Sequence, residues 1–141
     1  MIFWDTSAVV PLLVDEPRSK EVTGVLRGDP TMVVWWGTEI ECRSALARRG
    51  REGMAQARVE QARGVLEALI PHWSEVLASA EVRWHAARAL RVHPLRAADA
   101  LQLGAALTWA QARPTWHPFF TFDRSLREAA RAEGFVTDPS G

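Results

Sequence analysis

Acidic side chains that directly follow apolar segments are the residues of this sequence best suited to chemistry. Asp5 follows the apolar run 2–4, and Asp123 follows the run 119–122. If both runs are strands of one parallel sheet, the two carboxylates lie at the same edge, where open α/β sheets bind their ligands. The alternative is that each aspartate only caps the helix that follows it, because Asp is among the best N-cap residues.

A third acid, Asp99, lies in a stretch that is otherwise almost entirely apolar, with Gln102 as the other clearly polar residue between 97 and 107. In the first turn of a helix the macrodipole favours an acid by about 0.3–1 kcal/mol, whereas burying an unpaired charge costs several kcal/mol. We therefore favour a functional role for Asp99. Acids that converge with no cation among them raise one another's pKa and favour hard divalent ions, Mg²⁺ or Mn²⁺.

Two glutamates compete for a fourth place beside these aspartates. Glu39 precedes Arg43 by four residues, a spacing that allows an exposed ion pair on a helix. Glu41 follows Thr38 by three residues and so completes a capping box at the helix start. Both glutamates therefore have a structural explanation, and helical periodicity alone does not choose between them.

The apolar pattern predicts strands that alternate with helices. We expect strands at 2–4, 32–35 and 119–122 and, from weaker signals, at 73–76 and 135–137. We expect helices at 8–14, 18–27, 38–49, 54–70, 79–90, 96–112 and 125–133, with 38–49 and 54–70 forming a hairpin. This order predicts an α/β fold, in which a parallel sheet of about four to five strands is flanked by helices on both sides (α/β/α).

Length and composition limit the remaining possibilities. A chain of 141 residues predicts one domain, 1–141, and its 17 basic and 17 acidic residues produce no global field that would hold nucleic acid. The single cysteine, Cys42, excludes an internal disulfide and a cysteine-cluster metal site, and a reducing compartment is the simplest setting. Because no run approaches about 18 apolar residues, we expect a cytoplasmic protein without a membrane span.

Four segments carry the candidate acids: Asp5-Thr6-Ser7, 41–49 (ECRSALARR), 95–106 (LRAADALQLGAA) and 121–126 (TFDRSL). In their order and spacing these segments resemble the acidic motifs of PIN-domain nucleases, and among them the VapC-type toxins of bacterial toxin–antitoxin pairs. The likeness extends from residue 2 to about residue 136. The resemblance implies a PIN-like fold and a metal-dependent ribonuclease.

Residue by residue, the resemblance assigns metal-ligand and catalytic roles to four acids: Asp5, Glu41, Asp99 and Asp123. It thereby selects Glu41 over Glu39. Family members commonly place a hydroxyl beside the acids, and Ser7 and Thr121 occupy those positions here as supporting residues. Gln102 is a departure, because the family often has histidine at that position.

The implied chemistry is hydrolysis of a phosphodiester with Mg²⁺, or alternatively Mn²⁺, as cofactor. Such ions polarise the phosphate and lower the pKa of a bound water. This mechanism does not consume a ribose 2′-hydroxyl, so the choice of RNA as substrate comes only from the resemblance. The resemblance also implies a homodimer and inhibition by a small cognate antitoxin protein that covers the acidic crevice.

Arginines and tryptophans could serve these partners. Arg43, Arg48 and Arg49, on the predicted hairpin, could grip RNA phosphates, or could equally form a solvated face. Trp35 ends a predicted strand and Trp36 follows it; because adjacent residues of an extended chain face opposite ways, one of the two is expected at the surface. With the apolar stretch 8–14 they form candidate docking surfaces. Three other tryptophans are expected in the core: Trp4, Trp84 and Trp109.

Two other functions remain as alternatives. The segment 3–9 (FWDTSAV) approximates the nucleophile motif of haloacid-dehalogenase-type phosphatases, but that chemistry requires a lysine near the aspartate, and the single lysine, Lys20, lies in an exposed-looking helix. A PIN-like module that binds RNA or protein without cleaving it is the second alternative. The presence of all four acids argues against that module.

Overall fold

The computed structural model describes residues 1–139, so Ser140 and Gly141, the last residues of the expected domain, lie outside the described part. Four strands form one sheet: β1 (Ile2–Trp4), β2 (Met32–Trp35), β3 (Ser74–Val76) and β4 (Phe119–Phe120). All pairs are parallel, in the order β3-β2-β1-β4. The predicted α/β class and parallel sheet are confirmed.

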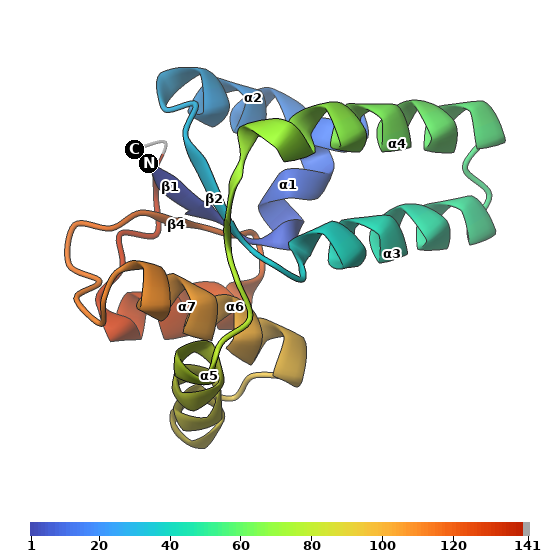
Figure 1. Ribbon diagram of the computed structural model, residues 1–141. Helices are drawn as coiled ribbons and strands as arrows, with labels where there is room; N and C mark the ends of the chain where they lie inside the picture. Colours follow the sequence, from blue (N-terminus) through green and yellow to red (C-terminus); the bar gives the residue numbers. More distant parts are fainter. Residues whose placement is uncertain (140–141) are drawn as a thin grey trace.

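Helices cover both faces of this sheet (Figure 1). They are α1 (Thr6–Leu13), α2 (Ser19–Gly28), α3 (Thr38–Arg51), α4 (Gln56–Leu69), α5 (Ala80–Val92), α6 (Ala97–Trp109) and α7 (Arg124–Glu133), with a short 3-10 helix, Ile70–His72, after α4. Helices α1, α2 and α4 lie on one side of the sheet and α5, α6 and α7 on the other, while α3 and α4 form the predicted hairpin that extends beyond the sheet (Figure 1). No helix of residues 1–139 is long and apolar enough to cross a membrane.

The alternation of side chains along the strands divides the core into two parts. Ile2 and Trp4 of β1 point into the layer with α1 and α2, and Phe3 points into the layer with α6 and α7. All three residues are buried, as expected for a central parallel strand covered on both faces. The buried stack of Phe3 on Phe119, with ring centroids 5.1 Å apart, joins β1 to β4.

Two predicted strands are shorter than expected. The strand predicted at 119–122 ends at Phe120, because hydroxyl groups take the next backbone N–H groups: Phe122 N donates to Ser7 Oγ and Asp123 N to Thr121 Oγ1. The strand predicted at 135–137 is reduced to a single bridge between Pro118 and Val136.

Two predictions about apolar residues are wrong. The stretch 8–14 is not a docking surface, because α1 packs against α2, α3 and α4 and five of its residues, Ala8 to Pro11 and Leu13, are buried. Trp84 is not in the core but 63% exposed. The buried face of α5 consists of Val82, His85, Ala86 and Ala89, which places Trp84 on the opposite side.

Helices α5 and α6 approach closely at Gly104. A Cβ atom at this position would lie 2.7 Å from the backbone oxygen of Val82 and 2.9 Å from the backbone nitrogen of Ala86. We expect Gly104→Ala to lower the free energy of unfolding by about 1–3 kcal/mol, because the helices must separate. Urea denaturation measures this change. Gly64→Ala in α4, where a Cβ meets nothing within 4 Å, is the control and should stabilise the protein; equal effects at both positions would contradict the argument.

Candidate active site

The four candidate acids line one pocket at the carboxyl edge of the sheet. This pocket has a volume of about 640 Å³, and its lining includes Asp5, Glu41, Asp99 and Asp123. Glu39 lies outside this lining, and its Oε2 accepts a hydrogen bond from Arg43 at 2.9 Å. A second cavity, of about 680 Å³, lies at the other end of β1 and includes Lys20 in its lining. The acidic pocket therefore contains the four acids that the resemblance selects, and Glu39 points elsewhere.

Asp5 combines the two roles that its position in the sequence allowed. It follows β1 and caps α1, because its Oδ2 accepts hydrogen bonds from the backbone N of Ser7 at 3.3 Å and from Ser7 Oγ at 2.7 Å. Thr121 Oγ1 donates to the same oxygen at 2.8 Å. Burial raises the pKa of Asp5, and these hydrogen bonds partly offset that rise. The side chain is thus both a helix cap and a buried wall of the pocket.

The two supporting hydroxyls connect the ends of β1 and β4. Ser7 Oγ lies 3.1 Å from Thr121 Oγ1, and both contact Asp5 Oδ2. Thr121 Oγ1 also accepts from the backbone N of Asp123, whose own Oδ1 accepts from Leu126 N at 2.8 Å and caps α7. The hydroxyl pair therefore holds Asp5 and Asp123 at adjacent positions.

Asp99 lies in the first turn of α6 and is half-buried. Burial, followed by the negative charges of Asp123 and Asp5, raises its pKa to about 6, against a smaller opposing effect of Arg96. Within residues 1–139 no ion pair involves Asp99. The charge is thus unfavourably placed for stability alone.

Glu41 does not form the predicted capping box. Gly37 is the N-cap residue of α3 and no side chain caps this helix, while the hydroxyl of Thr38 is buried against Gln102. The Glu41 carboxylate instead accepts a hydrogen bond from Thr6 Oγ1 at 3.0 Å. Burial raises the pKa of Glu41, hydrogen bonds from Thr6 and Gln102 oppose this, and the charges of Asp5 and Asp99 raise it further. Glu41 is therefore directed into the pocket rather than back to its own helix.

The donor set of this pocket fits a hard divalent cation. Among residues 1–139 no group of three Asp, Glu, His or Cys side chains is gathered closely enough to hold an ion by itself. Mg²⁺ does not require such a cage, since it commonly retains several waters and binds through one or two carboxylates together with phosphate oxygens. A bound cation would also relieve the repulsion that raises the pKa of Glu41 and Asp99. The carboxylates are thus suited to Mg²⁺ or Mn²⁺.

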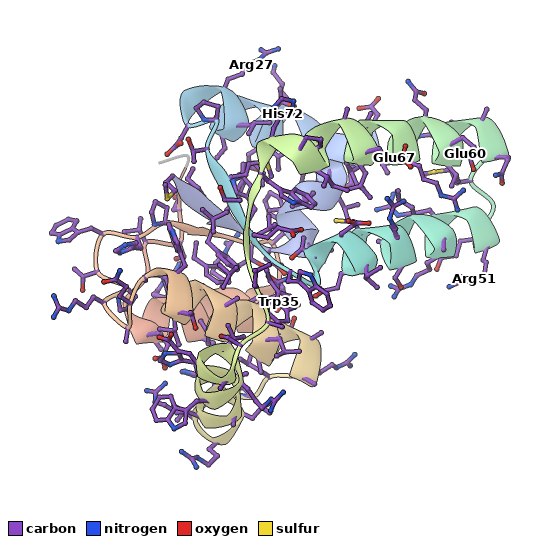
Figure 2. The ribbon with its side chains drawn as sticks, in the orientation of Figure 1. Arg27, Trp35, Arg51, Glu60, Glu67 and His72 are labelled. Carbon is purple, nitrogen blue, oxygen red and sulfur yellow. The ribbon has the colours of Figure 1, made fainter. Side chains whose placement is uncertain are left out.

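The three candidate RNA-binding arginines have different partners. Arg43 pairs with Glu39 on its own helix and lies 3.9 Å from Glu67 on α4, which runs beside α3 (Figure 2). Arg49 pairs with Glu16 at 2.8 Å. Arg48 is exposed, lines the acidic pocket and forms no ion pair within the described residues. Arg48 is therefore the one of the three whose charge is not already neutralised.

Three polar residues at or behind the pocket had no functional role in the sequence argument: Thr6, Thr38 and Gln102. Gln102 Nε2 lies 3.2 Å from Thr6 Oγ1 and 3.1 Å from Thr38 Oγ1. A signal was present, because Gln102 follows Asp99 by three residues on one helix and so shares its face. Sequence reasoning treated this residue only as a departure from the family pattern.

The tryptophan pair behaves as predicted. Trp35, at the end of β2 (Figure 2), is 7% exposed and Trp36 is 55% exposed. Ile40, which is 67% exposed, lines the acidic pocket. Of the other tryptophans, Trp4 is fully buried and Trp109 is half-buried against the core.

Comparisons with known proteins identify the family and support the fold. The PIN domain family model matches residues 2–132. Ribonuclease VapC47 of Mycobacterium tuberculosis is 32% identical over 148 residues, which cover 100% of this chain and 98% of that protein. The crystal structure of M. tuberculosis VapC20, a Sarcin-Ricin loop cleaving toxin, superposes with a TM-score of 0.68 at 17% identity and covers 96% of this chain and 97% of that one. FitAcB from Neisseria gonorrhoeae superposes with a TM-score of 0.71 at 18% identity, over 99% and 98% of the two chains. At these identities the two structures support the fold alone.

Proposed function

This chain belongs to the PIN-domain family, and on that basis we propose that it is a metal-dependent endoribonuclease and the toxin of a type II toxin–antitoxin pair. The observation that carries the proposal is the pocket itself. Asp5, Glu41, Asp99 and Asp123 line it together, and none of them forms an ion pair with a basic side chain within residues 1–139. Carboxylates that no basic side chain neutralises attract a divalent cation.

In the proposed mechanism the carboxylates of this pocket would hold Mg²⁺ or Mn²⁺ together with phosphate oxygens and waters, and the ion would supply polarisation of the phosphate and a more acidic water. The protein's own groups keep the carboxylates in place. Ser7 and Thr121 hold Asp5 through hydrogen bonds, and the cap of α7 orients Asp123. Asp5 is the one of the four that is buried, and its Oδ2 accepts from Ser7, two residues away, and from Thr121, 116 residues away.

Metal dependence distinguishes this function from its alternatives. Cleavage of RNA by the purified protein in Mg²⁺, lost in EDTA and restored by added Mg²⁺ or Mn²⁺, is the expected result. RNA binding without cleavage in any metal would support the non-catalytic module instead. Hydrolysis of p-nitrophenyl phosphate would support the phosphatase, for which the structure offers little, since Lys20 lines the separate cavity and not the acidic pocket.

Arg48 is the proposed phosphate contact beside the site. We expect Arg48→Ala to weaken RNA binding several-fold and to reduce the dependence of log affinity on log salt by about one unit, because one phosphate contact and its released counterion are lost. Fluorescence anisotropy with a labelled single-stranded RNA across a salt series measures both quantities. Arg43→Ala is the matched control, since its guanidinium already pairs with Glu39. Equal losses in the two variants would remove Arg48 from the interface.

The proposed partners are a small cognate antitoxin and a second copy of this chain. An arginine of the antitoxin that enters the pocket would pair with its carboxylates and compete with metal. Because Trp36 is exposed and Trp35 is buried, we expect Trp36→Ala to weaken antitoxin binding about tenfold or more without loss of stability. Isothermal calorimetry with the cognate antitoxin tests this expectation, and unchanged affinity would exclude Trp36 from the antitoxin-binding surface.

The proposed self-association is tested by light scattering of the free protein at tens of micromolar. A protein that is strictly monomeric at this concentration would contradict the dimer.

A further inference from the structure

A buried amide lies behind the acidic pocket. Gln102 on α6 is completely buried, and its Nε2 faces polar groups from two other helices. These are Thr6 Oγ1 of α1 at 3.2 Å, Thr38 Oγ1 of α3 at 3.1 Å and both carboxylate oxygens of Glu41 at 3.4 Å. One neutral side chain therefore joins the three helices that meet at the carboxyl edge of the sheet.

The direction of the hydrogen bonds follows from the groups involved. An ionised carboxylate only accepts, so the Thr6 hydroxyl, 3.0 Å from Glu41 Oε1, donates to it. The lone pairs of Thr6 Oγ1 are then available for an N–H of Gln102. The amide has two N–H groups; its shorter contacts are to Thr38 and Thr6, and its direct contacts to the two Glu41 oxygens, at 3.4 Å, are longer and weaker. The result is a directed chain from Gln102 through Thr6 to the Glu41 carboxylate.

Core packing does not explain an amide at this position. The Oε1 of Gln102 is buried and has no hydrogen-bond partner within residues 1–139, which costs free energy. Apart from Asp99 one turn earlier, the nearby residues on α6 are apolar, and Leu103 and Ala106 are fully buried. An apolar side chain of similar length would fill the space without the unpaired carbonyl. The polar groups that justify glutamine are therefore those around Glu41.

The neutrality of the amide also matters. A lysine or arginine at this position would form an ion pair with Glu41 and cancel the charge that attracts a cation. The amide supplies N–H donors without a net charge, so it orients the carboxylate and leaves the charge available. This combination suits a residue that prepares a metal ligand.

We propose that Gln102 is a positioning residue that orients the Glu41 carboxylate for metal binding through the hydroxyl of Thr6. The inference rests on the proposed metal-dependent function, because it assigns Glu41 to the metal. Groups that orient a metal ligand commonly contribute about 10–100-fold to metal affinity.

A titration of the RNA-free protein with Mn²⁺, in which electron paramagnetic resonance measures the bound ion, tests the proposal. We expect Gln102→Leu to weaken Mn²⁺ binding about tenfold or more, and the Mg²⁺ concentration for half-maximal RNA cleavage to rise with it. Thr38→Val is the matched control, because it removes the other acceptor of the same amide and leaves the path to Glu41 intact. The Mn²⁺ affinity of Thr38→Val should remain within about twofold of wild type, since Thr38 is not part of the hydrogen-bond chain from Gln102 through Thr6 to Glu41.

A double-mutant cycle tests the route through Thr6. If Gln102 acts through this hydroxyl, Gln102→Leu combined with Thr6→Val should bind Mn²⁺ no more weakly than the more severe single variant. Additive losses would exclude the route. Near-ultraviolet circular dichroism checks the fold of each variant, and Gln102→Met, with an unbranched side chain of similar length, replaces Gln102→Leu if that variant does not fold.

The outcomes separate the two hypotheses. A wild-type protein that binds no Mn²⁺ would overturn the proposed metal-dependent function, and this inference with it. If folded Gln102→Leu or Gln102→Met bound Mn²⁺ as tightly as wild type, the proposed function would remain and the positioning role would be overturned.

Discussion

Asp99→Asn is expected to reduce RNA cleavage by about a hundredfold or more, since loss of a direct ligand should exceed the 10–100-fold typical of groups that only orient one. The substitution keeps the size of the side chain and removes the charge that the proposed cation requires. Single-turnover cleavage of a labelled RNA at saturating Mg²⁺ measures the effect. Glu39→Gln, which removes an acid that lies outside the pocket, is the control and should cleave at the wild-type rate.

The same variant is expected to be more stable than wild type in EDTA. The pKa of Asp99 is raised from 3.8 to about 6, mainly by burial and then by the charges of Asp123 and Asp5, so the folded state disfavours the ionised form. For an acid with a raised pKa, this destabilisation is absent well below pH 4 and complete above pH 6. We expect a gain of about 1 kcal/mol at pH 7.5, allowing for solvent screening of a half-exposed group, and a smaller gain at pH 4.5.

Thermal unfolding of both proteins in EDTA at the two pH values tests this expectation. A variant that is less stable than wild type at pH 7.5 would support a structural role for Asp99. A variant that cleaves RNA at the wild-type rate would remove Asp99 from the proposed metal site. The two measurements are independent, so each role can fail separately.

Two substitutions of Asp5 are expected to separate its proposed role in cleavage from its role as the cap of α1. Asp5→Asn should abolish cleavage to a similar extent but keep the fold, because an amide oxygen can replace Oδ2 as acceptor for Ser7 and Thr121, and Asn is also a good N-cap. Asp5→Ala should abolish cleavage and also lower the free energy of unfolding by about 2 kcal/mol or more, since the cap and the acceptor for two hydroxyls are lost together.

Urea denaturation in EDTA, with cleavage assays on the same samples, distinguishes these outcomes. The expected pattern is two inactive variants with different stabilities. If both were as stable as wild type, the hydrogen bonds to Oδ2 would contribute nothing to the fold. If Asp5→Asn remained active, the charge of Asp5 would not be required for cleavage.

Local sequence patterns were sufficient to predict those features that depend on neighbouring residues: the strands, the helices and the helix caps. Buried strands such as 2–4 and 32–35 read as continuous apolar runs, and the helices between them follow from the spacing of apolar residues, so the parallel α/β sheet could be predicted. Asp5 and Asp123 could be placed at one edge of the sheet because strand ends in a parallel sheet share that edge. That both acids also cap helices was equally visible, since capping depends on residues two or three positions away.

The amino-acid sequence by itself thus predicted the fold class, the sheet edge at which the acids gather and, through resemblance, the four acids that line one pocket. Tertiary structure alone decided which partner each polar group finds. Arg49 is taken by Glu16, 33 positions away, and the hydroxyl of Ser7 ends a strand by accepting the N–H of Phe122, 115 positions away. Gln102 donates a hydrogen bond to Thr6, which lies 96 positions earlier in the sequence. Periodicity specifies which face of an element is buried, but the pairing of side chains on that face depends on how distant elements pack, and no local pattern encodes it.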